Sequence, residues 1–375
     1  MRPINSQGHS PLPFNPMEIE IDLSLGNGYT FTLPINGAGY EFNVDWGDGY
    51  SEFVNSTSPV GHTYAPVTRT VYTIKITGLF SRFYFNNSVY APMVTSVDIG
   101  GLDVTYKGSD FDGCDNLDFV NITKATSLLA SFRNNDNGTL NGVENIDTSL
   151  VTDMQQTFFK TRNFNQNINS WNVSSVTTFA NFFRDNTVYN QPMDSWDVSS
   201  STSLGGMFRG CSSFNQDISG WVINGVIGGM FYGCSSFNQD ISGWNTTPTT
   251  VFNNTFIGCS IFNQDISTWD VSNGTSFLNM LRNCTNFNQN LGAWNIDNAS
   301  DLQLMFLGSG LSDLNCQLTI EGWFTWDGTQ VTNTTQSNVL CGFNNNTINS
   351  SSDAGKIVAW MTANRGWTFT NLTLA

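Results

Sequence analysis

The chain is poor in charge, and above all in positive charge. Its 375 residues include 14 Lys and Arg against 30 Asp and Glu, a formal net charge of −16. A nucleic-acid surface needs clustered basic residues, and an anionic membrane attracts them, so neither is an expected partner. No apolar run approaches the roughly 20 residues of a membrane-spanning helix, so we expect no membrane insertion. Neutral glycans, protein subunits and cations remain as partners.

Histidine and paired cysteine are scarce as well. The two histidines, His9 and His62, leave little from which to build a nucleophile with its base. Seven cysteines, an odd number, argue against a fully paired disulfide framework. Cys316 and Cys341 could pair or stay free, since nothing in the sequence fixes their geometry. The N-terminal stretch lacks the apolar core of a signal peptide, which favours assembly into a virion over secretion unless the start has been trimmed.

What the chain has is repetition. The residues CSSFNQDISGW occur at 211–221 and again at 234–244. A tryptophan closes this stretch in six successive units, spaced by 25 or 23 residues: Trp171, Trp196, Trp221, Trp244, Trp269 and Trp294. Weaker units extend back toward residue 97. Such self-similarity predicts stacked coils, each of which buries its apolar edge against its neighbours.

Like residues of stacked coils should form columns, because equivalent positions of adjacent coils lie about 4.8 Å apart. Phe, Ile, Trp and the Met-Phe pairs are expected to make apolar columns. Inward asparagines would bond the backbone of their own and neighbouring coils, and they recur at Asn165, Asn190, Asn215, Asn238, Asn263 and Asn288. A column of buried thiols is expected at Cys211, Cys234, Cys259 and Cys284.

The units MFRGCSSFNQDISGW and MFYGCSSFNQDISGW resemble the repeat of bacterial surface proteins of the BspA-like, DUF285 type. The resemblance covers about residues 97–310. It implies a fold similar to the leucine-rich-repeat solenoid, and a protein of the cell-surface, adhesin-like or phage-encoded kind. It brings no catalytic residues with it.

Nearer the N-terminus, the series DWGDG, HTY and YTIKITG resembles a PKD domain, a small immunoglobulin-like β-sandwich, over about residues 17–80. This resemblance implies a spacer or protein-contact module and accounts for His62. Alternation in EFNVDW and VYTIKI predicts half-buried strands, and the pair Asp48 and Gly49 suits a hairpin turn.

These features predict a mainly β protein of four parts. They are an extended arm at residues 1–16, a PKD-like sandwich at 17–80, a solenoid similar to leucine-rich repeats at 81–312, and a small α/β cap at 313–375. Helical character over residues 354–363, followed by WTFTN, marks the cap, which a solenoid requires at its end.

Carboxylates recur at one phase of three coils, at Asp217, Asp240 and Asp265. Paired acids could hydrolyse a glycan, and the same column could hold Ca²⁺. Neighbouring coils carry Asn167, Pro192 and Asn290 at that phase, a tolerance that favours a corner-forming position. The DWGDG loop, with Asp45 and Asp48, is a second calcium candidate; no other cofactor is expected.

We therefore expect a non-enzymatic structural or adhesion protein on a virion surface, in a fibre, tail or capsid decoration. Its N-terminal part would anchor it to other subunits, copies would form a homo-oligomer, and the coils would meet a host-surface protein or glycan. A cellular surface adhesin whose leader was removed and a glycan-degrading enzyme on a solenoid are the alternatives. Glycosylation depends on the host and could use sequons such as those at Asn121, Asn172, Asn245 and Asn333.

Overall fold

The computed structural model describes residues 15–35, 40–55, 58–66, 69–79, 84–100, 106–122, 125–136, 139–333 and 337–375. The chain forms two compact units: Met1–Val151 with Lys160–Gln166, and Thr152–Phe159 with Asn167–Ala375. As expected the protein is mainly β, and its described residues contain two α-helices. Residues 1–14 of the expected arm lie outside the described residues.

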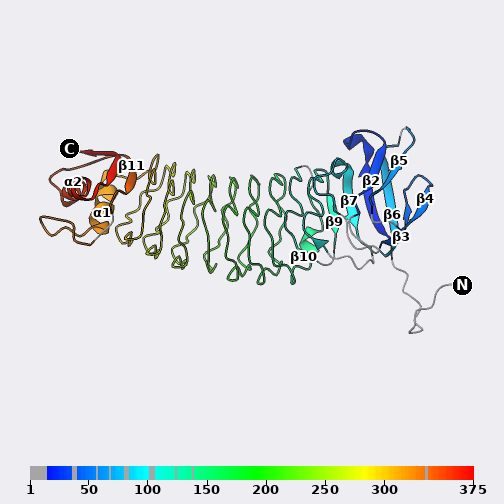
Figure 1. Ribbon diagram of the computed structural model, residues 1–375, viewed down its shortest axis with the longest axis horizontal. Helices are drawn as coiled ribbons and strands as arrows, with labels where there is room; N and C mark the ends of the chain where they lie inside the picture. The colour runs from blue at the N-terminus through cyan, green and yellow to red at the C-terminus, as the bar shows by residue number, and fades with distance from the viewer. Residues whose placement is uncertain are drawn as a thin grey trace. The chain divides into compact units, whose positions relative to one another are not determined.

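A six-stranded sheet organises the first unit (Figure 1). Its order is β4 (Ser51–Val54), β3 (Glu41–Asp45), β6 (Val71–Leu79), β1 (Met17–Asp22), β7 (Val94–Asp98) and β9 (Phe119–Asn121). A separate antiparallel pair consists of β2 (Thr30–Leu33) and β5 (Val60–Thr63). The alternating burial of β3 confirms the predicted half-buried strand. Its hairpin with β4 confirms the predicted turn.

The sheet runs directly into the first repeats. Strand β7 pairs antiparallel with β1 and parallel with β9, and Phe119 in turn bridges Asn141 in parallel. A second parallel pair joins β8 (Tyr106–Lys107) to β10 (Ala125–Ser127). Short 3₁₀ turns are η1 (Leu23–Leu25), η2 (Ala91–Met93) and η3 (Val143–Asn145). The weak units before Trp171 therefore extend one edge of the N-terminal sheet.

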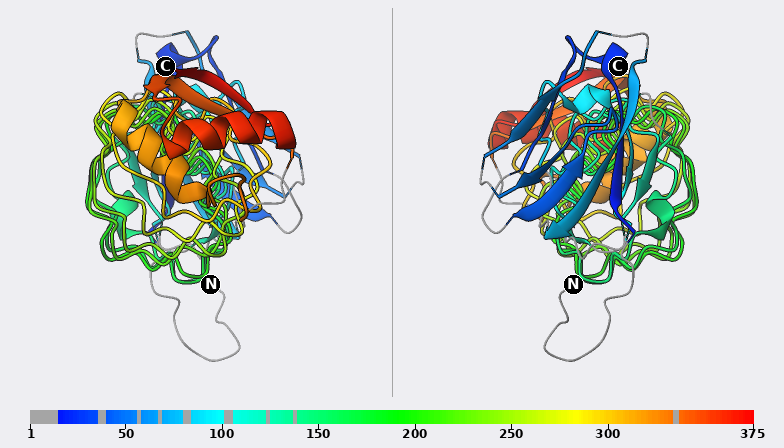
Figure 2. Two further views of the ribbon diagram at one scale, coloured as in Figure 1. Left: turned by 90° about the vertical axis from the view of Figure 1, so that its left-hand side faces the viewer. Right: turned by 90° about the vertical axis from the view of Figure 1, so that its right-hand side faces the viewer.

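In the second unit successive repeats lie on one another as coils. Parallel bridges join the same position of neighbouring coils, as from Thr178 to Ser203 and from Ser203 to Val226. Beside the bridges, amides bond to the next coil, for example Phe231 N to Thr255 O at 2.9 Å. Seen along the stack, the traces of these coils superimpose (Figure 2).

Columns of like side chains form the core of this unit, which confirms the predicted apolar columns. Ring centroids of adjacent coils lie 5.6–6.0 Å apart in the column Phe183, Phe208, Phe231 and Phe256. They lie 6.0–6.1 Å apart in the column Phe214, Phe237, Phe262 and Phe287. The rings in both columns are fully buried. Each coil thus removes large aromatic surface from water by contact with its neighbours.

Each coil bends at a residue with a left-handed backbone just before the buried pair of the Met-Phe segment. The φ angle there is +63° at Gly206, +65° at Gly229, +61° at Asn254 and +56° at Asn279. Glycine adopts this conformation freely and asparagine at low cost. The bend favours Gly or Asn in the central coils, although Gln156 and Leu304 adopt the same conformation at the corresponding positions of the first and last coils, with φ angles of +55° and +56°.

Four elements close the second unit after the last coil (Figure 1). They are α1 (Asp313–Trp323), β11 (Leu340–Ile348), α2 (Asp353–Arg365) and β12 (Thr368–Leu374). Serines cap both helices: Ser312 accepts the Asn315 amide and Ser352 the Gly355 amide. Helix α2 and strand β12 confirm the predicted helix and strand of the cap, whereas α1 was not predicted.

Candidate functional site

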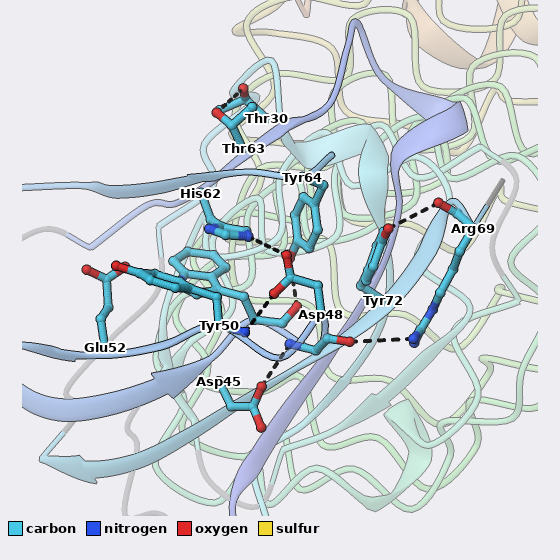
Figure 3. A network of polar contacts seen from close by, with 12 residues as sticks. Thr30, Asp45, Asp48, Tyr50, Glu52, His62, Thr63, Tyr64, Arg69 and Tyr72 are labelled. Carbon is cyan, nitrogen blue, oxygen red and sulfur yellow. Dashed lines mark hydrogen bonds and ion pairs between the residues drawn. The ribbon is translucent and has the colours of Figure 1, made fainter. Parts of the chain in front are cut away.

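The turn between β3 and β4 carries the polar network of Figure 3. The His62 ring lies between those of Tyr50 and Trp46, with centroid distances of 5.2 and 5.1 Å. Its Nε2 is 2.8 Å from Asp48 Oδ2. The Tyr64 hydroxyl donates to the Trp46 carbonyl at 3.0 Å. These contacts tie β5 to the turn, so His62 has the structural role that the HTY motif implied.

The two calcium candidates of this turn are engaged in closing it. Asp45 accepts the Gly47 amide at 2.9 Å, and Asp48 accepts the Tyr50 amide at 3.0 Å. The Arg69 guanidinium reaches the Gly47 carbonyl at 3.5 Å, and its positive charge disfavours a cation here. The arrangement is that of a rigid turn.

Asp48 should make the N-terminal unit sensitive to acid. Burial acts to raise its pKa, but hydrogen bonds from the His62 ring and the Tyr50 amide together hold the pKa of Asp48 below its ordinary value. Because the pKa of Asp48 is lowered in the folded state, its carboxylate stabilises that state at pH values above the ordinary aspartate pKa of about 4. This contribution is lost as the pH falls below about 4 and through the lowered pKa of the folded state.

We expect Asp48→Asn to lower the free energy of unfolding by about 1–2 kcal/mol near neutral pH. The difference in free energy of unfolding between the variant and the unmodified chain should shrink in acid. The Asp48 carboxyl is then protonated and, like asparagine, uncharged. Urea unfolding of both proteins at neutral and acidic pH measures this. A loss of equal size at both pH values would contradict the assigned role.

The repeat tryptophans line up along one edge of the core, and each is 2–4% exposed. Each indole Nε1 donates to a carbonyl of the preceding coil at 2.9–3.2 Å: Trp196 to Ile168, Trp221 to Met193, Trp244 to Ile218, Trp269 to Ile241 and Trp294 to Ile266. Trp171 is equally buried. The indoles therefore fill the core and satisfy a corner carbonyl at once.

The next tryptophan of this column was not predicted from the sequence. Trp323 in α1 donates to the Leu291 carbonyl at 2.8 Å and is 3% exposed. It follows Trp294 by 29 residues, because a helix takes more residues to cover the same edge. The similarity of EGW to the repeated SGW was the available signal.

The repeat asparagines form a ladder at the surface. Each amide oxygen accepts the backbone N–H of the next asparagine at 2.9 Å, from Asn190 to Asn215, Asn238, Asn263 and Asn288. Gln239 adds a bond from its Nε2 to the Asn215 carbonyl. The side chains are partly or fully exposed, so the expected inward orientation was wrong: the preceding phenylalanine takes the inward position. Asn165 is also exposed and belongs to the first unit.

The family model described as "Mycoplasma protein of unknown function, DUF285" matches residues 126–228 and 226–323, more than half of the chain. The chain belongs to the DUF285 family. This confirms the resemblance carried by the repeated units. No curated protein and no solved structure matches the chain. Among the described residues, no helix has the length and apolar character to cross a bilayer.

In the DUF285 coils, the recurring carboxylates are exposed corner residues. Asp217, Asp240 and Asp265 each accept the amide two residues further on, at 2.9 Å. Hydrogen bonds from Ser242 lower the pKa of Asp240. Asn167 accepts a bond in the same way in its own coil. The column thus makes local turns, as its tolerance of Asn indicated.

These carboxylates do not gather into a metal site. Within the described ranges, no group of three or more His, Cys, Asp or Glu side chains is placed to hold a metal ion. One oxygen of each aspartate instead accepts an amide of its own turn. In the contacts observed, Asp217, Asp240 and Asp265 shape the corners of the coils.

The thiol column lies in the core of the DUF285 coils. Each Sγ donates to a phenylalanine carbonyl of the preceding coil at 2.9–3.2 Å: Cys211 to Phe183, Cys234 to Phe208, Cys259 to Phe231 and Cys284 to Phe256. All seven cysteines are buried and free, Cys316 and Cys341 included, so the pairing that the sequence left open does not form. Burial raises the pKa of these thiols, that of Cys316 to about 12.

We expect the native chain to react slowly with a thiol reagent such as Ellman's reagent, because burial and a raised pKa withhold the thiolate. After unfolding in guanidinium without reductant, seven thiols per chain should react. Release of the coloured thiolate measures both. A value near five in the unfolded chain would reveal a disulfide, and rapid reaction of the native chain would contradict the buried column.

The four named sequons have defined local contacts. Asn172 and Asn245 accept the amides of Ser174 and Thr247, the hydroxyl residues of their own sequons. Asn121 donates to an aspartate of β7, and Asn333 donates to the Trp323 carbonyl. Asn172 and Asn245 are exposed, so a glycan attached there would project from the corners of the coils.

Proposed function

We propose that this DUF285 protein is a non-enzymatic, surface-displayed structural or adhesion protein. In this proposal the coils are a solenoid similar to leucine-rich repeats, and the N-terminal sheets are a PKD-like sandwich that serves as spacer and anchor. Membership of DUF285 supports a surface-type protein of unknown function.

One observation carries the proposal: the side chains that recur from coil to coil form the contacts that build the coils and hold them together. The tryptophans, thiols and asparagines bond to the preceding or following coil, and the recurring acids close their own turns. Between them the side chains differ from coil to coil, and several are apolar and exposed, such as Val222 at 49% and Ile261 at 43%. A regular frame with a varied surface suits recognition by contact better than catalysis.

A phage or other virion is the particle on which we place the protein, in a fibre, tail or capsid decoration. The resemblance to surface repeats that phages also encode supports this choice. Display in many copies would convert weak contacts with a host surface into firm attachment.

Imaging with gold-labelled antibody and proteomics of purified particles test the location, and binding of the labelled full chain to host cells tests adhesion. We expect labelling of the particle surface and saturable binding to cells. A protein found on a cell envelope instead would favour the cellular adhesin. Absence from particles together with absence of cell binding would overturn the proposal.

A further inference from the structure

From residue 167 to residue 312, positive charge is confined to one position of the coils. Residues 167–312 contain three basic residues, Arg184, Arg209 and Arg282. Each directly follows the last buried residue of the Met-Phe segment, so all three share one phase of the repeat. The two coils between Arg209 and Arg282 carry Tyr232 and Ile257 at this phase. We call these five residues the arginine row.

Contacts with neighbouring coils, or within the same coil, hold the arginines of the row in place. The Arg209 guanidinium lies over the Tyr232 ring, 4.2 Å from its centroid, and that of Arg184 lies 5.4 Å from the Phe159 centroid. Arg282 bonds to Asn279 Oδ1 at 3.4 Å. All five residues of the row are partly exposed. Cation–π packing of this kind orders an arginine and leaves the donors at its edge available.

In the central coils the row is followed by glycines: Gly210, Gly233 and Gly258 come directly after Arg209, Tyr232 and Ile257. A Cβ added to Gly233 would meet only Gly210, at 3.7 Å, and one added to Gly258 would meet only Gly233, at 3.8 Å. Their left-handed φ angles explain the glycines locally. Tyr232 therefore stands on a shallow open strip, whereas Asp185 lies against Gly210 beside Arg209, where an added Cβ would be 2.8 Å from Asp185 Oδ1.

The charge around the row makes it selective for anionic groups. Every acidic residue in residues 167–312 is an aspartate, and one of them adjoins the row: Asp185 Oδ2 lies 3.7 Å from Arg184 Nε. Carboxylates elsewhere on the coils repel an anion, so attraction is concentrated along the row. Guanidinium groups match carboxylate and sulfate oxygens with two parallel hydrogen bonds.

We propose that the arginine row binds an acidic polysaccharide, whose carboxylate or sulfate groups pair with Arg184 and Arg209 while a sugar ring stacks on Tyr232. The proposal rests on the proposed display function and names its ligand class. A linear glycan fits an open strip that crosses successive coils at about 4.8 Å per coil. Nucleic acid fits less well, because a nucleic-acid surface needs clustered basic residues and the row has three arginines spread over five coils.

Binding of the full chain to immobilised heparin, hyaluronate and neutral dextran tests the proposal. We expect binding to one or both acidic glycans that weakens with salt, and none to dextran. The double variant Arg184→Gln/Arg209→Gln should weaken that binding at least tenfold, and Tyr232→Ala should weaken it severalfold. The matched control Lys75→Gln/Lys356→Gln makes the same change in net charge at exposed positions outside the coils and should leave binding within about twofold.

The far-ultraviolet circular dichroism and thermal midpoint of each variant show whether it is folded. Equal loss in both double variants, tighter binding to duplex DNA than to either glycan, or no binding to either acidic glycan would overturn the proposal.

Cell attachment separates this proposal from the display function. If the full chain attaches to host cells and Arg184→Gln/Arg209→Gln attaches equally well, the row has no role in attachment and the proposal fails while the display function stands. If the chain binds heparin through the row but attaches to no cell and is absent from particles, the display function fails while the row remains a glycan site.

Discussion

Replacing Trp244 with alanine should lower the free energy of unfolding by about 3–5 kcal/mol. The indole is 3% exposed, its ring centroid lies 6.2 Å from that of Trp269, and its Nε1 donates to the Ile218 carbonyl at 3.0 Å. Alanine leaves a cavity between two coils and a buried carbonyl without its donor. Both effects fall on the interfaces that join neighbouring coils, which supply most of the stability of a repeat array.

A second variant at Trp244 separates the parts of this loss, and a variant at an exposed position serves as the control. Trp244→Phe keeps an aromatic ring in the column and loses the hydrogen bond, so about 1 kcal/mol should be lost through the bond, with a further cost for the smaller ring. Val222→Ala, at a side chain 49% exposed, should stay within about 0.5 kcal/mol of the unmodified chain.

Urea unfolding followed by circular dichroism measures all three, with hydrogen exchange to show whether neighbouring coils open first. If Trp244→Ala cost no more than Val222→Ala, the column would not be what holds the coils together.

Periodic features were the predictable part of this fold. A residue that recurs at one phase has the same neighbours in each coil, so the buried Phe, Trp and Cys columns followed from spacing alone. The end of the array did not follow. Trp323 repeats the contact of Trp294 from a helix, and helical spacing breaks the period on which the prediction depended.

The direction of a side chain was harder to predict than its phase. Asn238 recurs as strictly as Phe237, but only the coil backbone shows that the phenylalanine points inward and the asparagine outward. The pairing of β7 with β1 could not be predicted either, since it joins a repeat strand to a strand far away in the sequence.

The arginine row was missed for a related reason. The two coils between Arg209 and Arg282 carry Tyr232 and Ile257, so the position does not stand out as a motif. Its signal was present in the sequence all the same, because the three arginines of residues 167–312 share one phase. The exposure of the row and the open strip beside it could be seen only in the structure.

The coil that ends at Trp244 is two residues shorter than the coils on either side, and the shortening falls in the corner after Trp221. Here the backbone passes close to the preceding coil. Asn224 Nδ2 donates to the Ser199 carbonyl at 2.6 Å, and the Gly225 carbonyl accepts from Thr249 on the following coil at 3.0 Å. A Cβ on Gly225 would lie 2.0 Å from the Thr202 carbonyl oxygen.

Gly225→Ala should therefore destabilise the protein by about 1–3 kcal/mol or more, because backbone atoms of two coils must separate. The matched control is Gly243→Ala in the same coil, where an added Cβ meets nothing within 4 Å. With an ordinary φ angle, that change should be neutral or stabilise by about 0.4–1 kcal/mol. Urea unfolding of the two variants gives the comparison directly. Inserting two serines after Asn224 in the Gly225→Ala chain should restore room at the corner and recover stability; if it does not, close approach to Thr202 is not why this short coil has glycine there.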